Sequence, residues 1–167
     1  MKERPDKMIP LEDFVKDAAG RASVIFEAKG QVLPMLHFVD GDGEESVTPV
    51  PMNDKDEASA FIRAMCAVFQ AKRAVFITEA WMLSEIGGIP DEVKKRTDRH
   101  GIRNEPGRIE VILINGEDQA EGLLMATREI IRNGNHKPTL GPLSIMKGMD
   151  QAQGRLVGFL PPMGARQ

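Results

Sequence analysis

The chain has 167 residues, with 22 Lys and Arg against 25 Asp and Glu, giving a formal net charge of −3. Hydrophobic residues make up 41% and charged residues 28%, which is typical of a globular domain. No apolar run approaches the ~20 residues of a membrane helix, the charged N-terminal stretch lacks the apolar centre of a secretory signal, and the mild acidity argues against nucleic-acid binding by bulk charge. With a single cysteine, these features predict a cytoplasmic protein of one domain, residues 1–167, that binds no membrane.

The N-terminal region predicts a helix after a frayed start at residues 1–9. Apolar residues recur at helical spacing over residues 10–19, Pro10 suits the first turn, and Gly20 suits a stop. Residues 22–28 either extend this helix or form a short strand.

The next region predicts a hairpin at the edge of a sheet. Two apolar segments, residues 31–39 and 45–51, are separated by the turn sequence Asp-Gly-Asp-Gly. Pro34, Pro49 and Pro51 favour an edge, because proline lacks the N–H that a central strand donates.

A second helix is predicted over residues 55–72. Asp54 and Glu57 have the spacing of a capping box, and acidic residues in the first turn with Lys72 and Arg73 at the end suit the helix dipole. One apolar stripe follows the helix and should cover a sheet face. Cys66 lies on this stripe, which indicates a buried apolar residue rather than a reactive thiol.

The C-terminal half predicts a meander of strands. A polar excursion over residues 84–107, with a short helix opening near Pro90, separates the first strand from the rest. Short turns between strands favour antiparallel pairing. We expect an α+β fold: a curved, mainly antiparallel sheet with one or two helices packed on one face and a frayed end at 161–167. The predicted strands are residues 74–83, 108–115, 122–131, 139–146 and 155–160.

The hairpin of residues 108–115 and 122–131 predicts two unlike faces. A turn centred between Asp118 and Gln119 would put Arg108 opposite Glu129, so that Glu110 would face Thr127. This face is the more polar one. The more apolar face, which we expect to meet the helices, holds Ile109, Val111, Leu113, Leu124, Ala126 and Ile130. A slip of one residue would exchange the faces.

The candidate catalytic site combines carboxylate side chains with an arginine. Glu79 is the only charge in a ten-residue apolar strand, and it must be solvated or paired, with Arg108 or Arg128 as partners. One interpretation is a small enzyme or ligand binder in which Glu79 and Glu110 act as acid and base, Arg108 binds an anion and His37 contributes. The other is a cross-strand ion pair on a half-solvated sheet.

The polar excursion also carries a weak nucleic-acid candidate. It contains a basic group, although no aromatic residue lies between its members for base stacking. The alternative is a solvated loop. No cofactor-binding or metal-binding motif occurs in the sequence. The basic residues are Lys94, Lys95, Arg96 and Arg99.

Four features resemble a group of small bacterial proteins that has no assigned activity. They are the Asp-Gly-Asp-Gly turn, the helix after Asp54, the run TEAWML and the later RIEVILINGED. The resemblance covers about residues 30–145, and only the excursion at 84–107 is longer than the group suggests. It implies one compact domain and transfers no catalytic residue.

Together these observations predict a non-catalytic domain that acts through protein association, either with itself as a homo-oligomer or with a protein partner. Ten methionines and the absence of an enzyme signature support this expectation. The enzyme and the nucleic-acid accessory protein remain the alternatives.

Overall fold

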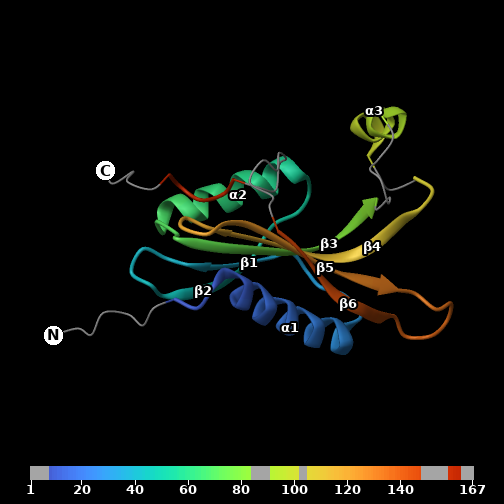
Figure 1. Cartoon of the computed structure of the whole chain (residues 1–167), viewed down its shortest axis with the longest axis horizontal. Coiled ribbons are helices and arrows are strands. Elements are labelled where there is room, and N and C mark those ends of the chain that lie inside the picture. Colours follow the sequence, from blue (N-terminus) through green and yellow to red (C-terminus); the bar gives the residue numbers. More distant parts are fainter. Residues whose placement is uncertain (1–7, 84–90, 102–104, 148–157, 163–167) are drawn as a thin grey trace.

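The computed structural model describes residues 8–83, 91–101, 105–147 and 158–162. Within these ranges six strands form one open antiparallel sheet in the order β2-β1-β3-β4-β5-β6 (Figure 1). The predicted α+β class with an antiparallel sheet is confirmed. The strands are β1 (Met35–Val39), β2 (Glu45–Pro49), β3 (Arg73–Leu83), β4 (Arg108–Asp118), β5 (Gly122–Ile131) and β6 (Thr139–Met146). The helices are α1 (Leu11–Lys29), α2 (Lys55–Val68) and α3 (Asp91–His100).

Helix α1 lies against one face of the sheet and builds the larger core. Val15, Ala22 and Phe26 are fully buried along its inner stripe. They pack against alternate residues of the central strands, such as Ile77 and Ile114. The helix runs ten residues past the predicted end at Ala19, because its apolar stripe continues beyond Gly20.

Helix α2 lies against the opposite face (Figure 1). Ile62 and Cys66 are fully buried against Leu36 and Phe76, which alternate with the residues that meet α1. The expectation that the helices share one face is therefore wrong in this detail, since each face carries one of them. The helix also ends at Val68, earlier than predicted.

The register of β4 and β5 differs from the predicted one by three residues. Val111, not Arg108, pairs with Glu129, because β4 continues to Asp118 and the turn lies beyond it. The predicted apolar face is correct for β5 but wrong for β4, where Ile112 and Ile114 meet α1. Glu110 consequently shares its face with Arg128 and Ile130 instead of Thr127 and Glu129.

Strand β3 extends beyond the end of its neighbour β1. β1 pairs with β3 only as far as Ile77, whereas β3 continues to Leu83 paired with β4. We call residues 78–83 with their partners 108–113 the arm. Helix α3 stands beyond the end of the arm (Figure 1).

The remaining predictions concern the chain ends and the last strand. Residues 158–160 are not a strand, and the rest of the predicted strand 155–160 lies outside the described residues. Ile9 and Pro161, both placed in the frayed ends, accept hydrogen bonds through their carbonyl groups, from Arg73 and Gln119 respectively. None of the described helices has the length and apolarity to cross a membrane.

Candidate functional site

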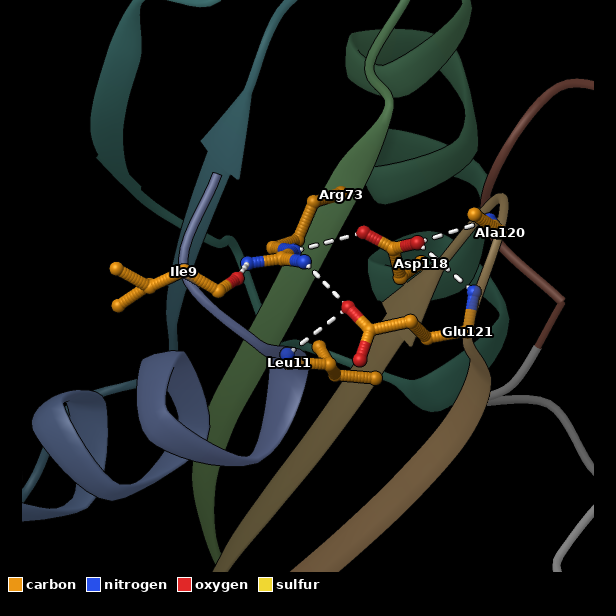
Figure 2. Close-up of polar contacts among 6 residues, drawn as sticks. All are labelled: Ile9, Leu11, Arg73, Asp118, Ala120 and Glu121. Carbon is orange, nitrogen blue, oxygen red and sulfur yellow. Dashed lines mark hydrogen bonds and ion pairs between the residues drawn. The ribbon is translucent and has the colours of Figure 1, made fainter. Parts of the chain in front are cut away.

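The face of the sheet that meets α1 carries two polar clusters, one at each end. The Arg73 cluster lies where α1 begins and comprises Ile9, Leu11, Arg73, Asp118, Ala120 and Glu121 (Figure 2). The distal cluster lies on or beside the arm and comprises Glu79, Trp81, Arg108, Glu110 and Arg132. The two clusters use similar side chains in different surroundings.

In the Arg73 cluster, one buried guanidinium joins three segments of the chain. Arg73 is 2% exposed and donates to Asp118 at 2.8 Å, to Glu121 at 2.8 Å and to the carbonyl of Ile9 at 2.6 Å (Figure 2). Its guanidinium also lies 5.3 Å from the ring centre of Phe14 on α1. The side chain therefore ties the start of α1 to β3 and to the β4–β5 turn.

The two carboxylates of this cluster have further donors. Asp118 accepts from the backbone N–H groups of Ala120 and Glu121 at 2.8 and 2.9 Å, which closes the β4–β5 turn. Glu121 accepts from the N–H of Leu11 at 3.0 Å, at the positive end of the α1 dipole. The negative charge of Glu121 is thus offset by the N-terminus of α1. These contacts indicate that the Arg73 cluster has a structural role.

The distal cluster contains the two predicted catalytic carboxylates, and both are already engaged. Glu110 forms a bidentate ion pair with Arg132, with both N–O distances at 2.7 Å, and this contact raises the pKa of Arg132 above its ordinary value. Glu79 accepts from the backbone N–H of Val32 at 2.6 Å, which explains a carboxylate inside an apolar strand. The arginines that the sequence suggested for Glu79 bond elsewhere, with Arg128 donating to Ser23 and to the carbonyl of Gly141.

Trp81 and Arg108 form a stacked pair in the distal cluster. Trp81 is 40% exposed, and the Arg108 guanidinium lies 5.0 Å from its ring centre. Arg108 also donates to the carbonyl of Glu105 at 3.0 Å, while its buried Nε has no hydrogen-bond partner among the described residues. An arginine stacked on a tryptophan is a common arrangement at binding surfaces.

His37 lies far from the distal cluster. It pairs with Val75 on the neighbouring strand, whereas Glu110 pairs with Trp81, six residues further along β3. At about 3.3 Å per residue this separation is about 20 Å. Glu79, Glu110 and Arg108 therefore share one end of one face, and His37 does not join them.

His37 instead belongs to the buried end of α1. Its ring lies 4.7 Å from that of Phe14, and its Nε2 is 3.3 Å from the Glu45 carboxylate. Burial lowers the pKa of His37 below its ordinary value, the Arg21 charge lowers it further, and the hydrogen bond to Glu45 opposes both.

The predicted basic residues lie on α3. Arg96 forms an ion pair with the Glu105 carboxylate, with the Nη2–Oε2 distance at 2.7 Å. Lys94, Lys95 and Arg99 are exposed. Acidic residues occupy the first turn of the same helix, so its charge is mixed.

Cys66 is buried, as the sequence indicated. Burial raises the pKa of its thiol to about 12, so the nucleophilic thiolate is scarce at neutral pH. No cluster of His, Cys, Asp or Glu side chains that could hold a metal ion occurs within residues 8–83, 91–101, 105–147 and 158–162.

Three of these residues were not predicted from the sequence. Arg73 was expected at a helix end, although it begins a continuous apolar run, which is a strand signal. Trp81, the only tryptophan in the chain, and Arg132, which lies just past the end of β5, were not among the expected site residues.

Comparisons with protein-family models, with curated proteins and with solved structures find no match. The resemblance to small bacterial proteins therefore stays a prediction.

Proposed function

We propose that this protein acts by non-catalytic protein association and that the arm is its contact surface. The observation that carries the proposal is Trp81, which is 40% exposed on the part of β3 that continues past the end of β1. Tryptophan and arginine dominate the binding energy of many protein interfaces, because tryptophan buries a large area at a small cost in side-chain entropy and arginine adds several directed hydrogen bonds. The stacked pair of Trp81 and Arg108 fits that role.

The charges of the arm also suit a protein partner. The distal cluster has two arginines and two glutamates, so it neither repels nor strongly attracts a surface of one sign. A neutral, partly apolar surface with a polar rim is typical of a protein interface.

The two alternatives gain less from the geometry. For catalysis, Glu79 and Glu110 are both occupied by donors within the chain, and His37 is distant. For nucleic-acid binding, α3 offers exposed lysines, but two acidic residues lie in its first turn. Both alternatives stay predictions.

Site-specific photo-cross-linking tests the proposal. A photoreactive residue replaces Trp81 in the full chain, and Phe69 serves as the matched control, because it is also aromatic and 44% exposed but lies at the end of α2. In the cells that naturally produce the protein, we expect one cross-linked species of discrete mass from position 81 and several-fold less from position 69. No product at position 81, or equal products at both positions, would contradict the proposal.

A further inference from the structure

The outer edges of the sheet are protected against pairing with another strand, whereas the edge of the arm is not. In β2, Pro49 lacks the N–H group that an added strand would need. In β6, Pro142 lies beside a β-bulge. Residues 78–83 contain no proline, and the register of β3 with β4 is regular throughout.

Backbone hydrogen bonds show which peptide groups face the free edge. The carbonyl of Lys72 accepts from Gln119 beyond β4, so even-numbered residues of β3 point toward β4 and odd-numbered residues point away. The hydrogen bond from the Val50 N–H to the Pro34 carbonyl shows that the peptide groups of even-numbered residues in this part of the chain point toward β2. Those of Met35 therefore point toward β3, where those of its partner Ile77 point back toward β1. This again directs odd-numbered residues of β3 away from β4.

Three residues of the arm therefore direct their N–H and C=O groups away from β4. They are Glu79, Trp81 and Leu83, and no described strand pairs with them on that side. The carbonyl of Glu79 accepts from the hydroxyl of its neighbour Thr78 at 3.3 Å, whereas the N–H of Glu79 and the peptide groups of Trp81 and Leu83 have no strand partner among the described residues. Such a row of peptide groups is a template for strand addition.

We propose that a second copy of this chain occupies this edge, by antiparallel pairing of β3 with β3 across a two-fold axis at Trp81. This inference rests on the proposed function and names its partner. In this register Trp81 of one copy pairs with Trp81 of the other, and Glu79 pairs with Leu83 in both directions. The two sheets then join into one continuous sheet.

The charges favour this antiparallel register. Parallel pairing in register would place Glu79 against Glu79 of the other copy, and like charges directly opposite destabilise a sheet. In the antiparallel register Glu79 faces Leu83, whose partner on β4 is Arg108. Arg108 and the Glu79 of the other copy would therefore flank Leu83 on the same face of the joined sheet, where their opposite charges attract.

The side chain of Trp81 provides a direct measurement. The chain has one tryptophan and no tyrosine, so its intrinsic fluorescence reports the arm alone. We expect sedimentation velocity to show a monomer–dimer equilibrium, with a blue shift of the emission and reduced quenching by iodide over the same concentration range. A monomer at all concentrations with unchanged fluorescence would overturn the proposal.

A matched pair of substitutions at Leu83 tests the backbone pairing. Leu83→Pro removes the N–H that faces the free edge, while Leu83→Ala removes the same side-chain contacts and keeps it. The two-fold axis doubles the effect, so we expect Leu83→Pro to weaken the dimer about tenfold more than Leu83→Ala does. Equal dissociation constants would overturn strand pairing, and circular dichroism shows whether each variant is folded.

Two further results keep the test decisive if Leu83→Pro does not fold. In the unmodified chain, amide hydrogen exchange of residues 79–83 should slow as the concentration rises. Trp81→Lys, which places two like charges at the axis, should be monomeric. A cross-link from position 81 to a different protein, with the chain itself monomeric, would overturn this inference and leave the proposed function standing. No cross-link at all would overturn both.

Discussion

The Arg73 cluster and the distal cluster use the same chemistry on the same face of the sheet, and they differ in what covers them. Arg73 lies under the first turn of α1 and is 2% exposed. The side chain of Arg132 lies beyond the other end of that helix and is 53% exposed. Each guanidinium binds carboxylate, but only the pair of Arg73 with Asp118 is buried on both sides, with side-chain exposures of 2% and 3%.

This difference decides what each cluster can do. A buried ion pair is costly to break, because the remaining charge cannot be solvated, so the Arg73 cluster holds elements together. An exposed pair contributes little stability and leaves its side chains available to a partner. Cover by α1 therefore separates a structural cluster from a binding surface.

The largest expected effect comes from Arg73→Met. The substitution leaves Asp118 buried without its cation and frees the start of α1, so we expect a loss of about 3–5 kcal/mol in the free energy of unfolding. Urea denaturation measures it. Arg132→Met is the matched control at the distal cluster, and we expect about 1 kcal/mol or less there. Similar losses in both variants would remove the contrast between the clusters.

A smaller effect is expected at Gly116, where α1 packs tightly against β4. A Cβ at Gly116 would lie 2.6 Å from Val15 Cγ2, so Gly116→Ala should cost about 1–3 kcal/mol through overpacking. Gly20→Ala is the control on the same helix, where the added Cβ meets nothing within 4 Å. We expect that change to stabilise by about 0.5–1 kcal/mol, because alanine restricts the unfolded chain and favours helix. Thermal unfolding of the pair checks both signs.

The pH dependence of the free energy of unfolding should report on His37, which is buried at the end of the sheet that α1 covers. Because the pKa of His37 in the folded protein is below the ordinary value of 6.5, the unfolded chain binds the proton first. The contribution of neutral His37 to the free energy of unfolding is complete above pH 6.5, and it is lost as the pH falls toward the pKa of His37 in the folded protein. His37→Phe should flatten this decline in urea denaturation between neutral pH and about pH 5.

Two other carboxylates, Glu12 and Glu105, provide the comparison at lower pH. Lys147 and Lys16 lower the pKa of Glu12, and Arg96 lowers that of Glu105, so their contributions are lost only below the ordinary value of 4.5. A slope near pH 6 that is unchanged in His37→Phe would show that another group causes it.

The smallest expected effect is the coupling of Glu110 with Arg132. A double-mutant cycle with Glu110→Gln and Arg132→Met should give about 0.2–1 kcal/mol, and added salt should reduce it. A salt-independent coupling of several kcal/mol would mean that the distal cluster is as structural as the Arg73 cluster.

Several features of the candidate site could be read from the sequence, and others could not. The single charge in the apolar run of β3 identified Glu79 as a carboxylate that needs a partner, and Val32 supplies that contact. The choice of Val32 over an arginine depended on where the loop after α1 passes. The grouping of Glu110 with Arg108 followed from strand alternation, which is local. Glu79 was added as a lone charge and His37 without knowledge of its position along β1, and only the pairing of the strands shows that Glu79 joins the group and His37 does not.

The sequence by itself determined most of the helices and strands, because the spacing of apolar residues is a property of neighbouring positions; the exceptions are residues 22–28, left open between helix and strand, and 158–160, which form no strand. It also determined the antiparallel class, since the turns between strands are short. Only the tertiary structure decided the register of β4 with β5, the side of the sheet that each helix covers, and the partners of Arg73. Ile9 and the turn residues Asp118 and Glu121 lie far from Arg73 in the sequence, and only the fold brings them within hydrogen-bond distance of its guanidinium. Local spacing carries no information about such contacts, because their geometry depends on the lengths of strands and helices far apart in the chain.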